Sequence, residues 1–589
     1  MDFLSTPLLV TVILGSVGLA IPIIDSLKKE RGANNRLYCG IAVGALILII
    51  SIIIIRVLSG EQIPTIEFGK GMLADDMFGA FFGITLLIVS IMVTVSSWDF
   101  MKNKTNPAAY YSLILLSSIG MILIAYSTDL VMLLVAWELM SIPTYALAAF
   151  SKRDPISNEA AIKYFLFGAL SSAILVFAIG LVYGITGTTN IGQALVSMVN
   201  VQKDLIPVSL LALALFIAGF GFKMGLVPFH MWLPDAYEGA PTTIGALLSA
   251  GTKKAGFAAA IRVIILAIFV LHLDWSVLLA IIAIFTMTIG NLGALVQKSV
   301  PRILAYSSIA QAGYIMIGLA LAPYNDQALA GSLFHILNHA VMKAAAFIAV
   351  AAVAISLTSY SLEKYRGLAR RMPLTAIALS ISLLALAGVP PLNGFWSKLV
   401  LFGSAINSGP EVWWGPYLAI AGVLNSALSL GYYAWIMRKM YMEDSPDTSR
   451  VKEPRAISAV LIFAMIFMVG FGIWHADPHP GNISITSNGT IILYDFGMVG
   501  RIDDETRRRL VRLYLGLVDK DPVRTTDVLI ELGTLEATVD RRLVERGLEL
   551  SIQSLHARRV RIPFGQKLPI ISEFLNLGIV LITCIYIIL

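Results

Sequence analysis

The sequence predicts an all-α polytopic membrane protein with about fourteen transmembrane helices, followed by a segment of different character. Of its 589 residues, 57% are hydrophobic and only 14% are charged, whereas a soluble domain carries about 25% charged residues. Apolar runs of roughly 20 residues, the length that crosses a bilayer as a helix, recur along the first 474 residues. Lipid is therefore expected to be the solvent for most of this chain.

Each predicted span is an apolar run that ends in a polar loop. The first run has no basic residues before it and no small-residue cleavage site after it, so we expect a retained span and not a cleaved signal peptide. The spans are expected at about 7–24, 37–58, 76–97, 109–126, 128–150, 160–186, 206–232, 241–271, 275–297, 303–322, 328–356, 372–402, 415–436 and 456–474.

Basic residues are sorted between alternate loops, which supports the number of spans. Loops after odd-numbered spans contain 19 Lys and Arg residues, whereas loops after even-numbered spans contain two, Lys70 and Lys203. Cytoplasmic loops carry the excess of Lys and Arg in membrane proteins. The N-terminus is therefore predicted to lie outside, with the odd-numbered loops in the cytoplasm.

The composition changes abruptly at residue 475. Between 475 and 567, 27 of 93 residues are charged, and 568–589 is apolar again. We therefore expect a membrane domain over 1–474, a polar segment over 475–567 and a possible terminal apolar span over 568–589. Two cysteines are too few to hold an iron–sulfur cluster, and the chain has no Rossmann or P-loop glycine motif.

Several ionisable residues fall deep inside predicted spans, where a charge costs at least about 2.5–3.5 kcal/mol. Such residues are functional candidates, and the alternatives are snorkelling to the interface or a purely structural ion pair. Lys163 lies at the start of its span, so snorkelling explains it equally well. The deep candidates are Glu138 in the fifth span, Lys223 in the seventh, Lys253 and Lys254 in the eighth, Lys343 in the eleventh and Lys398 in the twelfth.

The eleventh span carries a row of three titratable groups. His335, His339 and Lys343 have the spacing i, i+4, i+8, which stacks them on one face of a helix. A buried row of this kind suits proton transfer through intervening water. Ordinary structural histidines, which do not require this alignment, are the alternative.

Prolines interrupt two of the spans. Pro228 lies in the seventh span, and Pro390 and Pro391 lie in the twelfth, within about two turns of Lys223 and Lys398 respectively. Paired interruptions at corresponding places in two halves indicate the transport site of repeat-built transporters. Because the two broken spans are five apart, we predict two inverted five-helix repeats, over spans 4–8 and 9–13. Simple proline kinks are the alternative.

Five stretches resemble the antiporter-like membrane subunits of respiratory complex I, and subunit N most closely. The resemblance covers 1–474, although FHILNHAVMK is nearer to the L, M and Mrp branches, and Mrp-type cation/proton antiporters share the fold. The five stretches are AWELMSIPTYAL, FKMGLVPFHMWLPDAYEGAP, KSVPRILAYSSIAQAGYI, FHILNHAVMKAAAF and GVPPLNGFWSKL.

The resemblance implies a proton-translocating subunit of an oxidoreductase that transfers electrons from NADH, or a related donor, to quinone. No cofactor or metal is expected in this chain; quinone, the donor, flavin and iron–sulfur clusters would belong to partner subunits. The implied partners are other antiporter-like and small membrane subunits, a quinone-reducing peripheral arm and the lipid membrane, without nucleic acid. The implied location is the plasma membrane of a prokaryote or an equivalent energy-transducing membrane. A subunit of an Mrp-type Na⁺/H⁺ antiporter is the alternative.

The same resemblance implies roles for individual residues. Glu138 would pair with Lys223, and the lysine of the eighth span would be Lys253, four residues before Phe257, or its neighbour Lys254. Lys398 would be the terminal lysine of the relay. The remaining relay groups would be His230, His335, His339 and Lys343.

The segment from 475 resembles the catalytic core of UbiB-type atypical kinases, and we expect a partial α/β kinase-like segment there. HADPHPGN and the following DFG reproduce the kinase spacing, which would make Asp477 the catalytic residue and Asn482 and Asp495 the magnesium ligands. The nucleotide loop, strand lysine and partner glutamate of a kinase are not found, so kinase activity is not expected. A natural fusion, an engineered join and a gene-assembly error are all compatible with this arrangement.

Overall fold

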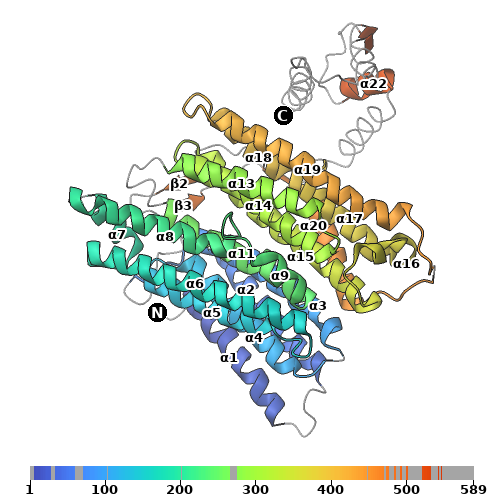
Figure 1. The fold of residues 1–589 in the computed structure, drawn as a ribbon, viewed down its shortest axis with the longest axis horizontal. Coiled ribbons are helices and arrows are strands. Elements are labelled where there is room, and N and C mark those ends of the chain that lie inside the picture. Colours follow the sequence, from blue (N-terminus) through green and yellow to red (C-terminus); the bar gives the residue numbers. More distant parts are fainter. Residues whose placement is uncertain are drawn as a thin grey trace. The chain divides into compact units, whose positions relative to one another are not determined.

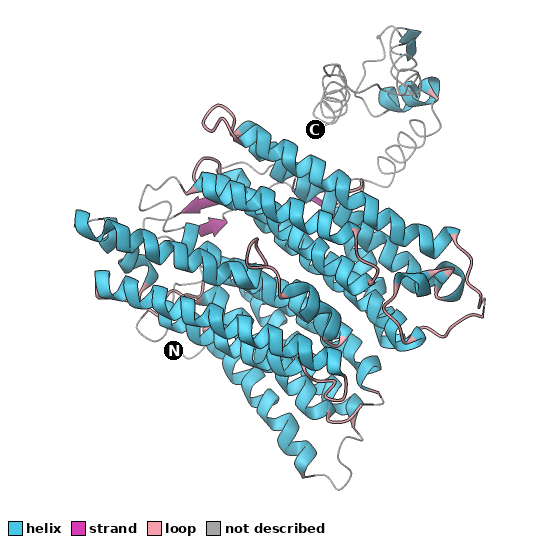
Figure 2. Ribbon diagram, viewed as in Figure 1, coloured by secondary structure: helices cyan, strands magenta, loops and turns pink. Residues whose placement is uncertain are grey.

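The chain forms two compact units, which are described separately. The first comprises Met1–Phe471 and Asp477–Gly497, and the second comprises Gly472–Ala476 and Met498–Leu589. Figures 1 and 2 show that the first unit is a bundle of long helices. The computed structural model describes residues 5–27, 34–59, 71–102, 104–199, 202–265, 275–447, 449–469, 473–475, 483–485, 491–493, 499–501, 521–531, 541–542 and 545–546.

Helix is present in all fourteen ranges where spans are predicted, which confirms the all-α polytopic fold. Within the described ranges, eleven helices are each long and apolar enough to cross a membrane. The eighth and twelfth spans are divided into shorter pieces, and the fourteenth is a helix of 15 residues. The uninterrupted spans are α1 (Thr6–Ser26), α2 (Asn35–Leu58), α3 (Met77–Met101), α4 (Pro107–Tyr126), α5 (Leu130–Ala148), α6 (Pro155–Thr186), α13 (Ser276–Leu295), α14 (Val300–Leu321), α15 (Asp326–Leu357), α19 (Gly415–Met442) and α20 (Arg455–Val469).

The seventh span is broken where the sequence predicts. Its first half, α8 (Ile206–Met224), ends at Gly225, whose φ is +67°, a value that glycine adopts without steric cost. The second part, α9 (Leu233–Gly239), follows a turn that contains Pro228. The continuous helix therefore ends earlier than the predicted limit of residue 232, because the glycine ends it before the proline is reached.

The twelfth span is broken in the same manner. α17 (Pro373–Ala387) is followed by Gly388, whose φ is +85°, and then by Pro390 and Pro391. α18 (Asn393–Asn407) continues the span. Proline has no N–H to donate to a helix ladder, so both breaks leave carbonyl groups inside the bundle that other groups must satisfy.

The described part of the eighth span alternates between α- and π-helical segments and changes pitch three times. It consists of α10 (Thr242–Ala246), the π-helical segment η2 (Leu247–Thr252), α11 (Lys253–Ala260) and a second π-helical segment, η3 (Ile261–Ile265). π-helical turns are rare and occur frequently at functional sites. Lys253 and Lys254 begin the α-helical piece between the two.

The two five-helix repeats make corresponding contacts. α4 packs against α5 as α13 packs against α14, and α5 packs against α6 as α14 packs against α15. α6 packs against α8 as α15 packs against α17 and α18. These contacts support the repeats over spans 4–8 and 9–13, and an odd offset reverses the direction of each helix in the second repeat.

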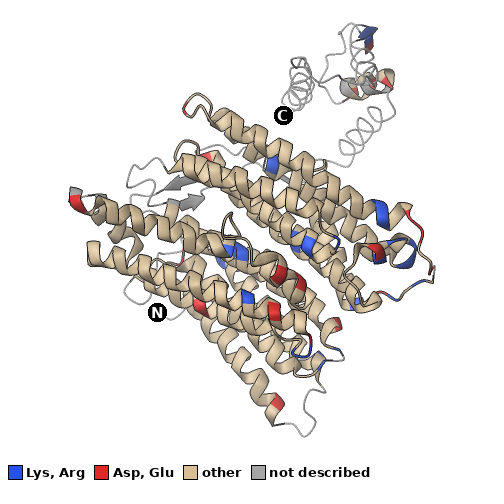
Figure 3. Cartoon of the chain, in the orientation of Figure 1, with Lys and Arg blue, Asp and Glu red and all other residues tan. Residues whose placement is uncertain are grey.

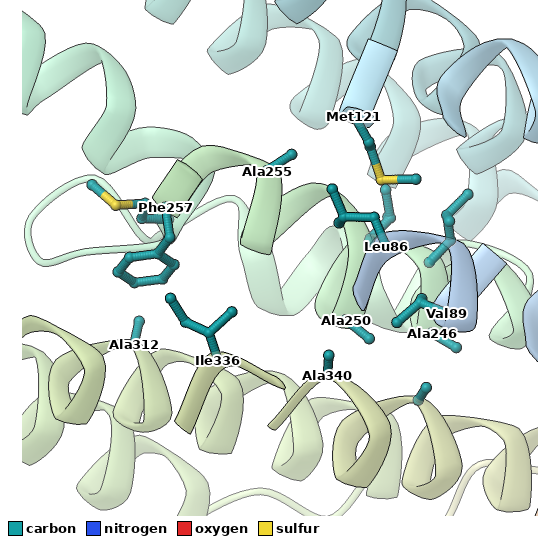
Figure 4. Packing of buried hydrophobic residues seen from close by; sticks show 14 of the residues in the cluster. Leu86, Val89, Met121, Ala246, Ala250, Ala255, Phe257, Ala312, Ile336 and Ala340 are labelled. Atoms are coloured by element: carbon teal, nitrogen blue, oxygen red, sulfur yellow. The ribbon is translucent and has the colours of Figure 1, made fainter. Parts of the chain in front are cut away.

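Small residues bring the central helices close together. Figure 4 shows alanines of the eighth span facing Ile336 and Ala340 of α15 on one side and side chains of α3 and α4 on another. Ala250, Ala340 and Phe257 are completely buried. Small side chains allow close helix packing in membrane proteins, so the region around the central lysines is densely filled.

The last helix of the bundle is capped by a residue far away in sequence. Oδ2 of Asp99, at the end of α3, accepts hydrogen bonds from the backbone N–H groups of Ala456 and Ile457, at 2.8 and 3.0 Å. Pro454 directly precedes α20 and cannot provide a side-chain cap. Asp99 therefore attaches the fourteenth span to the third.

Asp99→Ala is expected to destabilise the attachment of α20 by about 0.5–2 kcal/mol, the usual effect of removing a helix cap. Faster proteolysis of the 443–455 segment in purified complex would measure this change. Asp99→Asn is the matched control because its side chain retains an acceptor oxygen. Equal proteolysis rates for the two variants would contradict the capping role.

Shorter elements complete the described structure. Strand β1 (Ile473–His475) pairs antiparallel with β4 (Val499–Arg501), and β2 (Ile483–Ile485) pairs antiparallel with β3 (Ile491–Leu493). The predicted helical limit of 474 was therefore wrong, since α20 ends at Val469. Residues 568–589, predicted as a possible terminal span, lie outside the described residues. The other short helices are α7 (Ile191–Val199), η1 (Lys203–Leu205), η4 (Leu362–Tyr365), α16 (Leu368–Arg371) and α22 (Pro522–Glu531).

Candidate proton-relay site

Five lysines lie deep inside the bundle and are called the buried lysines below; Lys439, which is 7% exposed in the last turn of α19, is instead paired with Glu363 and Glu443. Figure 3 shows most charged positions at the ends of helices and some Lys and Arg positions midway along the bundle. Each of the five lysines is at most 4% exposed, and they come from the seventh, eighth, eleventh and twelfth spans. They are Lys223, Lys253, Lys254, Lys343 and Lys398.

Lys223, in the last turn of α8, is held by two hydroxyl groups. Its Nζ donates to Oγ of Ser141 on α5 at 3.0 Å and to the OH of Tyr164 on α6 at 2.9 Å. It also lies over the rings of Tyr164 and Tyr145, at 4.9 and 5.4 Å from their centroids. Such rings attract a cation without carrying a charge.

Glu138 does not touch Lys223, contrary to the direct pair that the family resemblance implied. Oε1 of Glu138 accepts a hydrogen bond from Ser172 on α6, whereas Lys223 contacts Ser141, one turn further along α5. Glu138 is partly exposed and shares its side of α5 with the exposed Val135 and Ile142. The carboxylate of Glu138 and the ammonium group of Lys223 therefore have separate hydrogen-bond partners.

The neighbouring lysines of the eighth span point in different directions. Lys253 Nζ donates to the backbone O of Ser308 on α14 at 2.7 Å. It also reaches the break of the seventh span, since a Cβ added to Gly225 would lie 3.1 Å from it. Lys254 instead contacts Nδ1 of His339 on α15. Lys253 thus faces the broken helix and Lys254 faces the histidine row.

The predicted row on α15 is confirmed as a buried face of the helix. His335 contacts Ser397 of α18 through Nδ1 and Gln311 of α14 through Nε2, each at 2.9 Å. The His335 and His339 rings lie 6.0 Å apart. Nε2 of His339 is buried without a hydrogen-bond partner.

Lys343 lies at the other end of this row. Its Nζ donates to Oγ of Ser307 at 2.7 Å and to the backbone O of Leu304 at 3.0 Å. Ser307 is also 2.5 Å from the OH of Tyr433 on α19. The lysine is therefore linked by one hydroxyl to the thirteenth span.

Lys398 caps the C-terminus of the first half of its own broken span. Its Nζ donates to the backbone O atoms of Leu386 and Ala387 at 2.9 and 3.1 Å, and to Oγ of Ser426 at 3.1 Å. It lies 4.5 Å from the ring centroid of Tyr314. The carbonyl groups at the C-terminus of α17, the negative end of its helix dipole, face this lysine.

A polar chain joins the histidine row to Lys398. His335 contacts Oε1 of Gln311, and Nε2 of Gln311 donates to the same Leu386 carbonyl that accepts from Lys398.

Sequence reasoning missed the neutral members of this network because they are not charged. The usable signal was their position inside apolar runs, one or two turns from a titratable group. They are Ser141, Tyr164, Ser307, Ser308, Gln311, Ser397 and Ser426.

His230 lies apart from this network. It follows Pro228 in the turn between α8 and α9, and its Nδ1 is buried without a hydrogen-bond partner. An unpaired buried ring nitrogen requires a water molecule or a transferred proton to satisfy it. The turn therefore provides a polar group at the break of the seventh span.

The buried lysines all have neutral partners. Hydroxyls, carbonyls and a histidine ring contact them, and none of the five forms an ion pair with a carboxylate within the described structure. Burying an uncompensated charge is costly, and neighbouring like charges raise that cost. Positive charge on one of these lysines therefore makes positive charge on its neighbours more costly.

The described residues do not form a metal site of familiar composition. Within those ranges, no three His, Cys, Asp or Glu side chains gather as a group that could hold a metal ion. The three kinase-like candidates, Asp477, Asn482 and Asp495, lie outside the described residues.

Comparison with protein families gives the affiliation of the bundle. Residues 127–429, which include all the buried lysines, match the family model described as NADH:quinone oxidoreductase/Mrp antiporter, TM. This chain belongs to that family. The chain is 41% identical over 437 residues to subunit N of the F420H2 dehydrogenase of Methanosarcina mazei, covering 72% of this chain and 85% of the relative.

Other members of the antiporter family agree with this assignment. Subunit N of the NADH-quinone oxidoreductase of Desulfitobacterium hafniense is 39% identical, over 69% of this chain and 84% of the relative. A chain of respiratory complex I from Thermus thermophilus is 29% identical with a TM-score of 0.64, covering 79% of this chain and 96% of that one. A chain of the Mrp complex from Dietzia is 23% identical with a TM-score of 0.68, over 80% and 94%, and shares the fold.

A second family model matches the C-terminal part of this antiporter-family chain. Residues 444–529 match the model described as ABC1 atypical kinase-like domain. The kinase-like resemblance of the tail is thereby supported. The match begins before α20, upstream of the boundary at 475 that the composition predicts.

Proposed function

We propose that this chain translocates protons as the N-type membrane subunit of a quinone-reducing respiratory complex. The observation that carries the proposal is the array of buried lysines with neutral partners, which runs from Lys223 to Lys398 through Lys253, Lys254 and the α15 face. When such sites cannot all be charged at once, binding of a proton at one end favours release of a proton at the other end. The relatives of 39–41% identity are N subunits of quinone- or F420H2-dependent oxidoreductases.

The relay is proposed to work by successive proton displacement. A proton that reaches Lys223 raises the electrostatic potential at Lys253, which lies against the break of the same span. Lys254 passes a proton to His339, because the two side chains are in contact. His335, Gln311 and the α17 carbonyls continue the path to Lys398. Buried water would bridge the remaining gaps.

Glu138 is proposed to act as the long-range trigger. Its carboxylate lies on a face of α5 that also carries exposed apolar side chains, and a charge facing lipid at this depth is costly. A partner membrane subunit is therefore proposed to cover it. A change of charge in that partner would shift Glu138 and so alter the proton affinity of Lys223.

Electron transfer is assigned to partner subunits. The proposed cofactors there are quinone, NADH or another donor, flavin and iron–sulfur clusters, with this chain contributing the proton path. We assign the chain to the plasma membrane of a prokaryote or an equivalent energy-transducing membrane, which its archaeal and bacterial relatives favour. The excess of basic residues in odd-numbered loops favours an N-terminus outside. The Mrp-type alternative is less favoured, because the Mrp complex chain shares only the fold at 23% identity.

Mass spectrometry of the native complex tests this function. An N-terminal tag would be used to recover the complex from membranes in mild detergent. We expect quinone-reductase subunits with iron–sulfur proteins among the recovered partners. Recovery of small Mrp-type subunits without these would replace the proposal with Na⁺/H⁺ antiport.

The tail is proposed to be dispensable for translocation and inactive as a kinase. The membrane domain is assigned to 1–474, the kinase-like segment to 475–567 and a possible apolar span to 568–589. The bundle is complete through α20, which Asp99 caps, and a kinase needs a nucleotide loop and strand lysine that the sequence does not contain.

Truncation after residue 474 is expected to leave assembly and proton translocation unchanged. The physical reason is that, within the part of the chain that the structure describes, every hydrogen bond of the lysine array is made with residues before that point. The measurements are the yield of native complex and the rate of proton uptake by inverted vesicles. Asp495→Ala in the full chain is the companion variant, and ATP-dependent phosphorylation that this change removes would contradict kinase inactivity.

A further inference from the structure

A second cluster of buried charges lies at one end of the bundle, away from the lysine array. Arg262, in the π-helical segment η3, forms an ion pair with Asp76 at the start of α3, at 2.7 Å. Both side chains are at most 10% exposed. Arg262 also donates from Nε and Nη2 to the backbone O of Ala125 in α4, at 3.0 and 2.7 Å. Asp76, Arg262 and the Ala125 carbonyl are called the outer clasp below.

The outer clasp fixes one end of the eighth span to the start of α3 and to the end of α4. Asp76 also accepts from the N–H of Gly79 at 2.8 Å as the cap of α3, so its position is determined by that helix. The guanidinium of Arg262 lies 4.5 Å from the ring centroid of Phe78. A planar bidentate cation held by three groups has little freedom.

The adjacent Asp75 makes a separate ion pair. Its Oδ2 accepts from Arg56 of α2 at 2.9 Å and from the N–H of Thr6 at 2.7 Å. This pair joins spans 1, 2 and 3 and does not include the eighth span. Two neighbouring carboxylates thus hold different helices, which makes each a control for the other.

A buried polar atom lies directly next to the clasp. The OH of Tyr126, directly after Ala125, is buried without a hydrogen-bond partner. Its ring covers Gly79, where an added Cβ would lie 2.3 Å from a ring carbon. The ring of Tyr126 therefore packs directly beside the clasp, against the first turn of α3.

The eighth span connects the clasp to the relay. Arg262 lies eight residues beyond Lys254, about 12 Å along the helix axis, and α11 carries both lysines between the two π-helical segments. Apolar packing fills this interval: Phe257, Ala258 and Ala260 are completely buried, and α11 packs against α3, α4 and α8. The distribution of basic residues predicts that this end of the span faces outside.

We propose that Arg262 is a positioning residue for proton transfer at Lys253 and Lys254, and that the outer clasp keeps the outer end of the eighth span closed to water. Release of Arg262 from Asp76 lets the π-helical segment η3 change pitch, which turns α11 and admits water along it. The clasp therefore governs from which side the central lysines exchange protons. This inference rests on the proposed function only in assigning the two lysines to a relay.

Thiol labelling in the native complex tests the closure directly. Ala259→Cys, in a chain with Cys39→Ser and Cys584→Ser, places a reporter one turn before Arg262, and an impermeant methanethiosulfonate is added from the outer side. Asp76→Asn removes the charge but retains the shape and the capping oxygen of α3. We expect it to label about 5- to 150-fold faster than the parent, the usual range of a coupling between sites.

Asp75→Asn is the matched control, because it removes the neighbouring charge without touching the eighth span. Its labelling rate is expected to stay within about twofold of the parent. Arg262→Met should label as fast as Asp76→Asn, and Arg262→Lys should lie between, since a lysine retains the charge but not the bidentate geometry. If Arg262→Met does not assemble, comparison of the labelling rates of Asp76→Asn and Asp75→Asn still tests the inference.

Two results would overturn the inference: labelling of Asp76→Asn at the parent rate, or equal acceleration by Asp75→Asn and Asp76→Asn. A second readout is the ratio of protons translocated to electrons transferred, which should fall for Asp76→Asn with the electron-transfer rate retained. A merely structural role would lower assembly without changing this ratio. Labelling does not require pumping, so failure of the proposed relay would leave the labelling result intact.

Discussion

Lys398→Arg is expected to lower proton translocation by about 10²- to 10⁴-fold, the usual contribution of a positioned proton-transfer group. Arginine retains the positive charge and can still donate to the carbonyl groups of Leu386 and Ala387, which Lys398 caps. It cannot release a proton in a protein. The substitution therefore separates the structural role of the cation from its role as a proton carrier.

The measurement is the initial rate of donor-driven acidification of inverted vesicles, normalised to the amount of assembled complex. Lys152→Arg, at an exposed lysine of the loop before α6, is the matched control and should translocate at the parent rate. Lys223→Arg is expected to behave like Lys398→Arg, because Ser141 and Tyr164 accept from either cation. Undiminished acidification by Lys398→Arg would show that this lysine only caps α17.

Gly394→Ala is expected to cause the largest loss of stability that a single methyl group produces in this chain. Gly394 lies in the first turn of α18, and a Cβ there would be 1.9 Å from the backbone O of Ala385. No side chain can move to relieve a contact with backbone. Overpacking of this kind costs about 1–3 kcal/mol or more, and the shifted α17 terminus would also move the carbonyl groups that hold Lys398.

Gly403→Ala is the control on the same helix, since a Cβ there has nothing within 4 Å. Removing a helical glycine is favourable by about 0.5–1 kcal/mol, so this variant should be as stable as the parent or more stable. The measurement is the temperature at which the purified complex loses half of its assembled form. Equal midpoints for the two variants would mean that the break between α17 and α18 is looser than its geometry indicates.

The sequence determined the membrane architecture almost completely. Apolar length and the sorting of basic loop residues depend only on transfer from water to lipid, which each segment undergoes nearly independently. The same independence explains why Glu138, Lys223 and Lys398 stood out, since an ionisable group in a long apolar run is costly wherever the helix packs. The i, i+4 spacing of His335 and His339 could likewise be recognised from the local sequence alone.

The tertiary structure alone decided which groups meet. The sequence favoured Lys253 and kept Lys254 as the alternative, and only the packing of α14 and α15 against the eighth span directs one lysine to Ser308 and the other to His339. The direct contact between Glu138 and Lys223 was wrong because the rotation of α5 presents Ser141 to the lysine. Helix limits also shifted, as Gly225 ended α8 before Pro228 was reached.

The outer clasp had no comparable signal in the sequence. Asp76 and Arg262 are 186 residues apart: Asp76 begins the third predicted span, and Arg262 lies inside the eighth, nine residues before its predicted limit at 271, with no partner that the sequence could indicate. Whether two such residues form an ion pair depends on the order and rotation of helices around the bundle, which neither local composition nor periodicity encodes. Burial cost therefore identified the charged groups inside the membrane from sequence, whereas their partners were set by long-range packing.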